Sequence, residues 1–517
     1  MWSFKETTFS VLGGLNSVDN AADIPQGPHD ENWDGILRMA QANNVFSPQK
    51  RYDLQTRPGM ADVRSTAINA AGIFTGMVHM GEIADKFLMA VSIAAGSHNF
   101  YDDVANPPTA IAGGTNFTIG ADNLVDWLLF RDGSAAVAIA LSRQRDLPQS
   151  FTSSATRANF TIAGTGLTSL KPAIGEIFGQ RAIYGDYNQD GTVHDDRVAY
   201  SDLRDGNLIS DITVQFYSFE TAQKDKVRAL RKFGDVCLVG KMNNVYLLAV
   251  TPQSAKPYQQ RELVAGRYKG PVSQQATLEA DGKLWWMGQT NIHSMDAEGR
   301  IADVGDIIRP TIAGLSDTRR EFTVAGYDSV NDLVLFAVSD GSDTKHQTII
   351  AVSTKKKNCC YIWTLSVNAM AQRLVTSENR LILGGYVGKF RNWNSGATGN
   401  LDDASAAIDA DIFTPRHHLG SPDWVKLFGG VKVTFDPQAS SEAVTLQYRL
   451  NDDSSWTSFA ASPYTVTGTA NDVDTKFFPL MKAGTHLQLR FRDANSGQVI
   501  RAQKYTIPWK LLHPMVT

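Results

Sequence analysis

The stretch DGKLWWMG (Asp281–Gly288) joins a polar turn to a run of apolar residues that ends at a glycine. A turn of Asp and Gly followed by aromatic and aliphatic residues is typical of a hairpin that leads into a buried β-strand. Trp285 and Trp286 are neighbours, so they point to opposite faces of this strand, because side chains alternate along an extended chain. We therefore expect each tryptophan to pack between stacked sheets.

The same unit of a polar turn and a buried strand recurs along the chain. Successive units start 46 to 55 residues apart. The six other units are DKFLMAV from Asp85, DGSAAVAIAL from Asp132, QRAIYG from Gln180, DVCLVG from Asp235, NDLVLFAV from Asn331 and NRLILGG from Asn379.

A period of this length with several strands per unit is the mark of a β-propeller. One four-stranded blade cannot bury both of its faces, so blades stack around an axis until the ring closes. Seven units predict seven blades, and six blades is the alternative if one unit is a decoy. An all-β protein with irregular repeats is the remaining alternative.

The flanking segments have different patterns. Residues 1–57 are rich in Gly, Asn and Pro, which predicts an extended strap, and we expect its first strand, KETTFSVL (Lys5–Leu12), to complete the last blade. The propeller is expected over residues 58–400 and a linker over 401–414, after a Gly/Asn/Ser-rich segment. Two short helices are expected at Glu220–Gly234 and, with a weaker pattern, at Asp402–Phe413.

Residues 415–517 change to longer alternating strands, such as Val431–Phe435, Val444–Leu450 and His486–Arg492. This alternation buries one face of each antiparallel strand and exposes the other. We expect a C-terminal immunoglobulin-like β-sandwich, with Trp456 and Trp509 available as core anchors.

Composition restricts the class of protein. The chain has 517 residues, of which 43% are hydrophobic and 20% charged, with a formal net charge of −4, so it can bury a large core and has no basic footprint for gripping DNA. Three cysteines, two of them adjacent, imply no disulfide framework. We see no signal peptide and no apolar run of the ~18 residues that a membrane span needs, so we expect synthesis in the cytoplasm and no membrane segment. The sequons at Asn116 and Asn159 are therefore taken as chance.

The densest acidic cluster is YGDYNQDGTVHDDRV (Tyr184–Val198). Asp186, Asn188 and Asp190 alternate before Gly191, as in the first half of a calcium loop, and the Thr192 carbonyl is available as a further ligand. However, Arg197 occupies the place of the bidentate acid, and no helix follows. We therefore interpret the stretch as a hairpin tip with an insertion in the third blade, and a calcium ion acting as a loop staple is the alternative. No other cofactor is expected.

Other candidate chemistry is weak. No nucleophile triad, nucleotide loop, paired Cys/His spacing or sialidase-type S-x-D-x-G-x-x-W box is found, so we expect no enzyme. The pair His417–His418 lacks a third metal ligand and is taken as a solvated loop. The basic run Thr354–Lys357 is taken as a hairpin tip.

Several stretches of the chain, within roughly residues 10–400, are similar in style and order to the propeller proteins of bacteriophage tails. They are GGLN (from Gly13), TRPGM (Thr56–Met60), RVAYSDLRDGN (Arg197–Asn207), VSQQATLEADGKLWWMGQTNIHSMDAEGRI (Val272–Ile301) and RREFTVAGYDSVNDLVLFAV (Arg319–Val338). The sequence thus resembles the tail nozzle or tail-stabilisation proteins of short-tailed phages.

This resemblance implies a virion protein of the phage tail. Such a protein forms a homo-oligomeric ring, usually a hexamer, below the head–tail adaptor, and it can dock tail fibres or tailspikes. DNA passes through the ring without sequence-specific binding. The alternatives are a receptor- or glycan-binding propeller without a conduit role and a propeller hydrolase.

Overall fold

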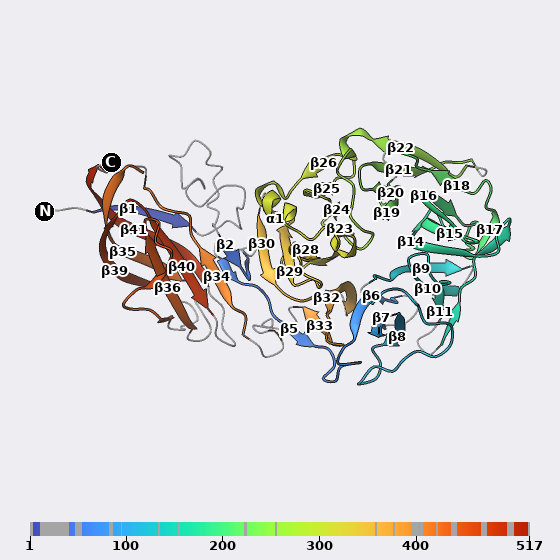
Figure 1. Ribbon diagram of the computed structural model, residues 1–517, viewed down its shortest axis with the longest axis horizontal. Coiled ribbons are helices and arrows are strands. Elements are labelled where there is room, and N and C mark those ends of the chain that lie inside the picture. Colours follow the sequence, from blue (N-terminus) through green and yellow to red (C-terminus); the bar gives the residue numbers. More distant parts are fainter. Residues whose placement is uncertain are drawn as a thin grey trace.

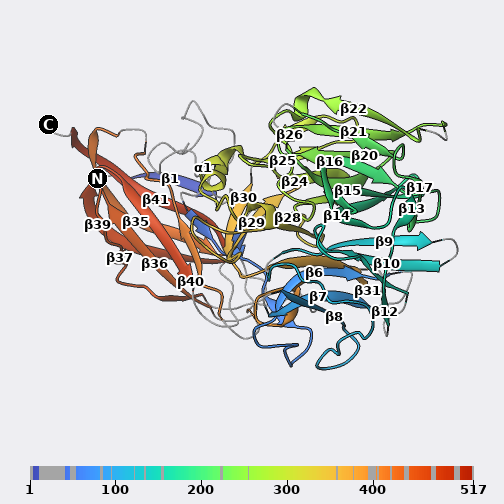
Figure 2. The ribbon, with the colours of Figure 1, turned by 45° about the vertical axis from the view of Figure 1, so that its right-hand side comes forward.

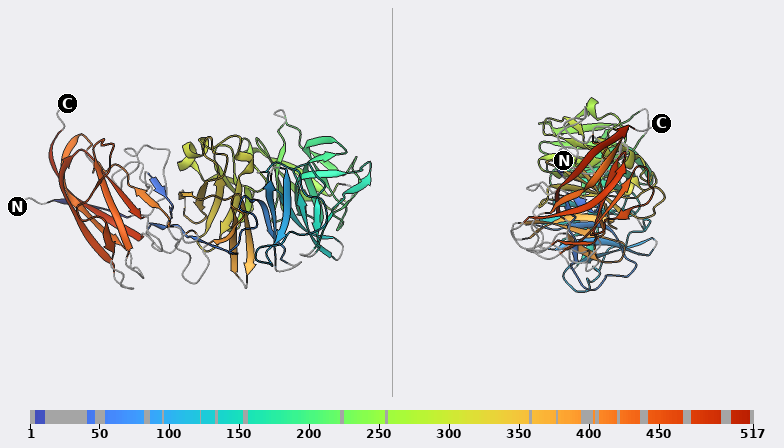
Figure 3. Two further views of the ribbon diagram at one scale, coloured as in Figure 1. Left: turned by 60° about the horizontal axis from the view of Figure 1, so that its bottom comes forward. Right: turned by 90° about the vertical axis from the view of Figure 1, so that its left-hand side faces the viewer.

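The computed structural model has two bodies side by side along its long axis, a ring of sheets and a two-sheet sandwich (Figures 1 and 3). It describes residues 4–10, 41–46, 54–81, 86–94, 96–121, 123–132, 135–152, 156–221, 225–253, 256–356, 359–375, 378–393, 403, 407–419, 422–435, 442–466, 473–493 and 501–514.

The ring is a β-propeller whose sheets follow one another in chain order (Figure 1). Blade one contains β6 (Ile73–His79), β7 (Phe87–Ala94) and β8 (Ser97–Asp102), and blade two contains β9 (Asp126–Asp132), β10 (Ala135–Leu141), β11 (Gln149–Phe151) and β12 (Arg157–Asn159). Blade three contains β14 (Leu170–Phe178), β15 (Arg181–Gln189), β16 (Thr192–Tyr200) and β18 (Phe216–Ser218). Beside it lies a parallel pair, β13 (Ala163–Thr165) and β17 (Leu208–Asp211).

The second half of the ring has the same organisation. Blade four contains β19 (Val227–Phe233), β20 (Val236–Lys241), β21 (Val245–Val250) and β22 (Tyr258–Leu263), and blade five contains β23 (Thr277–Ala280), β24 (Lys283–Met287), β25 (Ile292–Met295) and β26 (Ile301–Asp303). Blade six contains β27 (Val324–Asp328), β28 (Leu333–Val338), β29 (Thr348–Ser353) and β30 (Cys360–Thr364). Blade seven contains β31 (Ala369–Val375), β32 (Glu378–Gly384), β33 (Phe390–Trp393) and β5 (Met60–Asp62). Between blades lie 3₁₀ turns at Val264–Gly266, Asp306–Ile308 and Arg320–Phe322 and the helix α1 (Arg309–Ala313).

The repeated unit of the sequence is the second strand of each blade, which confirms the expected seven blades. Seven clusters of buried apolar side chains fill the seven contacts between neighbouring blades. Trp285 packs in the cluster between blades five and six, whereas Trp286 packs in the cluster between blades four and five. The two tryptophans therefore pack on opposite faces of β24, as the alternation predicts.

The ring is closed by a strand from the N-terminal part of the chain. β5 pairs antiparallel with β33, and Asp62 accepts hydrogen bonds from Lys389 and Arg391 at 2.9 Å or closer. The first strand does not close the ring, because β1 (Lys5–Ser10) pairs with β41 in the sandwich. The expectation that Lys5–Leu12 completes the last blade was therefore wrong.

The sandwich has two sheets, with β1 and β41, the first and last strands, in the same sheet (Figure 2). One sheet has the order β3–β4–β41–β35–β39, with β1 also on β41, and it contains β3 (Val45–Phe46), β4 (Leu54–Thr56), β35 (Trp424–Phe435), β39 (Asp474–Gly484) and β41 (Arg501–Pro514). The other contains β2 (Gln41–Asn43), β34 (Ala410–Phe413), β36 (Glu442–Leu450), β37 (Thr457–Ser458), β38 (Tyr464–Val466) and β40 (Leu487–Asp493). An immunoglobulin-like topology remains a prediction.

Three local expectations change. The segment expected to be a helix at Glu220–Gly234 contains β19, because pairing with β20 on the ring outweighs its helix-forming residues. The expected helix at Asp402–Phe413 contains β34, which pairs with β40, so the sandwich begins within the expected linker 401–414. Trp509 is in the sandwich core as expected, whereas Trp456 is only half-buried.

The two bodies are joined by one continuous sheet. β2 pairs in parallel with β30 of blade six and antiparallel with β34 of the sandwich. One hydrophobic cluster also runs through both bodies, from Leu335 in blade six to Phe491 in the sandwich. Trp363 stacks on Trp393 with ring centroids 5.4 Å apart, and its indole N–H donates to the Val45 carbonyl at 2.9 Å.

Arg57 lies at the centre of this junction and is 2% exposed. Its guanidinium donates to the Asn44 side chain at 3.1 Å, to the Thr364 carbonyl of blade six at 3.3 Å and to both carboxylate oxygens of Asp403 at 2.9 and 2.5 Å. A bidentate arginine–carboxylate pair fixes orientation as well as charge. Arg57 therefore ties the strap, blade six and the return to the sandwich together.

Replacing Arg57 by methionine is expected to destabilise the whole chain. The substitution removes the Arg57 donors to the Asp403 carboxylate and one of the two donors to the Asn44 side chain, which keeps the Thr364 amide. Removal of one partner of a buried ion pair costs about 3–5 kcal/mol. Thermal unfolding and limited proteolysis measure the effect, with cleavage expected between the two bodies. The control is Arg300→Met, whose ion pairs are exposed, and it should leave both readings close to wild type. A wild-type melt for Arg57→Met contradicts the assignment.

Candidate functional site

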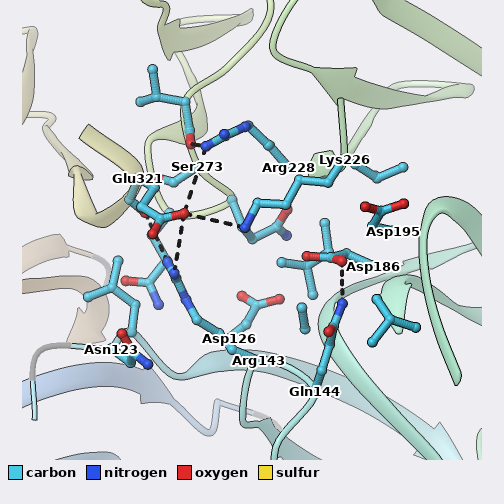
Figure 4. A pocket seen from close by; sticks show the side chains of 18 residues that line it. Asn123, Asp126, Arg143, Gln144, Asp186, Asp195, Lys226, Arg228, Ser273 and Glu321 are labelled. Atoms are coloured by element: carbon cyan, nitrogen blue, oxygen red, sulfur yellow. Dashed lines mark hydrogen bonds and ion pairs between the residues drawn. The ribbon is translucent and has the colours of Figure 1, made fainter. Parts of the chain in front are cut away.

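A cavity of about 380 Å³ lies at one mouth of the propeller axis, and we call it the axial cavity (Figure 4). Its walls come from blades two to six. They are the segments that lead into the inner strands of four blades, together with the turn after β10 and the hairpin of β15 and β16. Blades converge on the axis at their inner strands, so side chains from distant parts of the sequence meet here.

Three cations surround one carboxylate in this cavity. The Glu321 carboxylate lies 3.3 Å from Lys226, 3.8 Å from Arg143 and 3.9 Å from Arg228. Burial opposes ionisation of Glu321, but the charges of Arg143 and Lys226 keep its pKa below the ordinary value. Burial also lowers the pKa of the Arg143 and Arg228 guanidinium groups. Glu321, Arg143 and Arg228 are therefore all partly shielded from water.

Asp186 faces this cavity because of a β-bulge. The register of β15 against β16 shifts between Gly185 and Tyr187, and Asp186 has φ of 49°, a conformation that non-glycine residues rarely adopt. Its carboxylate accepts a hydrogen bond from the Gln144 side chain (Figure 4). Burial raises the pKa of Asp186 to about 7, with Lys226 as the largest opposing charge.

Polar side chains also link blades to one another around the axis. Gln274, which precedes blade five, donates to the Gly175 carbonyl of blade three at 3.1 Å and exchanges hydrogen bonds with the Leu230 backbone of blade four. Asp126 of blade two accepts from the Gly175 amide at 3.0 Å. Gln275 donates to the Val125 carbonyl at 2.6 Å. The axis at this level is therefore crossed by a hydrogen-bonded network.

The acidic stretch is the hairpin tip of blade three, as we expected. Asp190 and Gly191 form a two-residue loop and both have positive φ, which favours Asp-Gly in such a turn. The Asp190 carboxylate accepts from the backbone amides of Thr168 and Ser169, whereas the Asn188 side chain accepts from the Gly191 amide.

The four oxygen donors proposed for calcium therefore have separate partners. Asp186 turns to the axial cavity, Asn188 and Asp190 stabilise the tip, and Thr192 begins β16 directly opposite Gln189. Among the described residues no group of three or more His, Cys, Asp or Glu side chains is arranged to hold a metal ion. The side chains of Asn188 and Asp190 thus have a structural role at the tip, and the calcium staple stays a prediction.

The other sequence candidates have structural positions. His417 is fully buried, so its interpretation as part of a solvated loop was wrong; the Tyr505 hydroxyl lies 2.9 Å from its Nε2 atom, and burial lowers its pKa to about 3. Thr354–Lys356 follows β29 at the place of a hairpin tip, and Lys355 pairs with Asp281, whereas Lys357 lies outside the described residues. Among the described helices, none has the length and apolar character of a membrane span.

Sequence reasoning did not find the axial cavity. Arg143, the neighbouring pair Lys226 and Arg228, and Glu321 come from three distant parts of the chain, and no motif in the sequence marks them as members of one site. What three of them share is their place relative to the inner strand of a blade. Lys226 and Glu321 lie one and three residues before such a strand, and Arg228 lies at the start of one. That signal becomes readable only after the blade boundaries are known.

Several solved structures have a distant similarity to this chain. No protein-family model matches the sequence, and no curated protein has significant similarity to it. The WD40 β-propeller domain of Doa1 is 12% identical, with a TM-score of 0.40 over 66% of this chain and 98% of that one. A streptogramin B lyase is 9% identical, with a TM-score of 0.40 over 65% and 98% of the two chains. Virginiamycin B lyase from Staphylococcus aureus is also 9% identical, with a TM-score of 0.39 over 63% and 98%.

Replacing Asp126 by asparagine is expected to stabilise the protein at neutral and alkaline pH. Burial raises the pKa of Asp126 to about 7 despite the nearby Arg231, compared with an ordinary value of 3.8. The folded state thus holds this proton more tightly than the unfolded chain does, and the wild type loses stability as pH rises from about 4 to about 7. The asparagine variant avoids this loss of roughly 2–4 kcal/mol.

The readout is the difference in melting temperature between variant and wild type at pH 5 and pH 8. The difference should grow toward pH 8. Asp296→Asn is the control, because a backbone hydrogen bond from Arg300 lowers the pKa of that exposed carboxyl below 3.8. Asp296 is therefore ionised in the folded and unfolded states at both pH values, and the difference for its variant should stay constant. A difference for Asp126→Asn that stays constant with pH would overturn the assignment.

Proposed function

We propose that this chain is a non-enzymatic structural subunit of the tail of a short-tailed bacteriophage, with several copies forming a nozzle-type ring around the DNA exit path. The resemblance of its sequence to tail nozzle proteins supports this proposal. The structural observation that carries it is the fusion of propeller and sandwich into one body. A continuous sheet, a shared core and the buried Arg57 pair join the two parts.

Such a fusion suits a subunit of a ring, in which the propeller and the sandwich must keep a fixed orientation while the subunit contacts a neighbouring copy on each side. Domains joined by a plain linker move relative to each other by default, unless the interface is large and hydrophobic. In this chain the shared cluster contains both propeller and sandwich side chains, and β1 and β4 of the N-terminal segment pair with the last strand, β41. A ring made of such bodies would keep a constant bore.

The DNA path in this proposal lies between subunits. The axis of a single propeller is crossed by the Gln274 and Asp126 links, and the Glu321 cluster adds charged contacts from blades two, four and six. These side chains cross the space that a duplex would need. The net charge of −4 also suits a wall that DNA passes without being held.

The TRPGM motif of the resemblance lies at the junction. Thr56 ends β4, Arg57 makes the interbody contacts, and Met60 begins β5, which closes the ring. These five residues thus connect the sandwich to the propeller through the junction.

We propose the head–tail adaptor and tail fibres or tailspikes as partners of this chain, and the virion tail as its location.

A second candidate function is favoured by the axial cavity. Three cations, of which Arg143 and Arg228 are partly desolvated, lie beside carboxylates and amides and form a site for a small polar ligand, which suits a receptor- or glycan-binding propeller. A conduit ring does not require such a site. The two functions are separable by experiment.

The test is the oligomeric state of the full chain, measured by mass photometry and negative-stain microscopy with and without the head–tail adaptor protein. The proposal predicts a closed ring, with a hexamer as the expected size, and incorporation of tagged chain at the tail of virions. The control is the adaptor alone, which must not produce the same ring. A monomer that stays monomeric with adaptor and enters no particle contradicts the proposal.

A further inference from the structure

One wall of the axial cavity has three cations around a single carboxylate, and three further carboxyl groups, those of Asp126, Asp186 and Asp195, also line the cavity. Arg143, from the turn after β10, and Lys226 and Arg228, from the start of β19, approach the Glu321 carboxylate at 3.3 to 3.9 Å (Figure 4). These distances are long for charge-assisted hydrogen bonds, which are typically about 2.7–2.9 Å. The Nε atom of Arg228 is buried and has no hydrogen-bond partner among the described residues. The cationic wall can therefore accept a further oxyanion.

The part of the cavity that faces the cations has polar side chains that can form hydrogen bonds with the hydroxyl groups of a ligand. Asp186 and Asp195 supply carboxylate oxygens, and Gln144 and Asn123 supply side-chain amides (Figure 4). Hydroxyl groups donate to carboxylates and both donate to and accept from amides. None of the described side chains that line the cavity is aromatic, so there is no platform on which a nucleobase could stack.

We propose that the axial cavity binds a small hydroxylated carboxylate, such as the hexuronate unit of an acidic polysaccharide. The ligand carboxylate contacts Arg143, Lys226 and Arg228 beside Glu321, and the ligand hydroxyls contact the side of Asp186 and Gln144. The volume of about 380 Å³ is within the range for small-molecule sites. This inference goes beyond the proposed ring function, because ring assembly does not need the cavity to be filled.

Replacing Glu321 tests the proposal, because the proposal fixes whether ligand affinity rises or falls. Its carboxylate occupies part of the cationic wall and repels an incoming anion at short range. Glu321→Gln removes that charge and keeps the shape, so the variant should bind D-glucuronate about tenfold more tightly than wild type. Arg228→Gln should weaken binding by about tenfold and keeps the proposal testable if the first variant folds poorly.

Isothermal titration with the purified full chain measures both effects. D-glucose, which has a hydroxymethyl group in place of the carboxylate, is the matched ligand control and should bind at least tenfold more weakly. Arg300→Gln, an exposed substitution far from the axis, is the matched protein control and should leave glucuronate affinity unchanged. A glucuronate oligosaccharide added in parallel tells a polymer source from a free acid, and binding of either form supports the proposal.

Two outcomes would overturn it. One is no glucuronate binding to wild type or to Glu321→Gln at tens of millimolar ligand, a concentration at which even millimolar affinity is measurable. The other is weaker glucuronate binding by Glu321→Gln, which would show that the Glu321 carboxylate does not compete with the ligand for the three cations. Either result leaves the ring proposal untouched, because that proposal is judged by assembly and not by ligand binding.

Discussion

The buried contact of Arg57 with Asp403 is the constraint on which the arrangement of the two bodies depends. A guanidinium that is almost wholly shielded from water must have its donors satisfied, and here they are satisfied by groups from three parts of the chain. The strap, blade six and the entry to the sandwich can meet these donors only in one arrangement. The propeller and the sandwich are therefore held at a fixed orientation.

The closure of the ring follows from the same segment. Met60 follows Arg57 after only two residues, forms a β-bridge with Asp403 and begins β5. A ring closed by a strand from the other end of the chain cannot open without breaking that strand's pairing, so the first and last blades are locked together. The N-terminal part of the chain thus stabilises both bodies, with β1 and β4 on β41 and β5 on β33.

The sequence was informative wherever the physical signal was local and repeated. The turn and strand unit predicted every blade, and Asp190–Gly191 predicted its hairpin, because each depends on residues adjacent in the chain. Prediction failed where pairing partners are distant. The helix-forming residues of Val227–Phe233 became a strand beside β20, and the first strand joined β41 rather than blade seven. The axial cavity was invisible for the same reason, since Arg143 and Glu321 meet only after the ring has closed.

Hydrogen exchange at the junction tests most directly whether propeller and sandwich form one rigid body. The Asn44 amide donates to the Ile362 carbonyl of blade six at 2.9 Å, and the Arg57 amide donates to the Asn44 carbonyl at 2.8 Å. A rigid junction predicts that peptides containing these two amides exchange as slowly as the inner strands of the propeller, because they open only with the fold. Exchange within seconds, at the rate of exposed turns, would show two independently moving bodies and contradict the account.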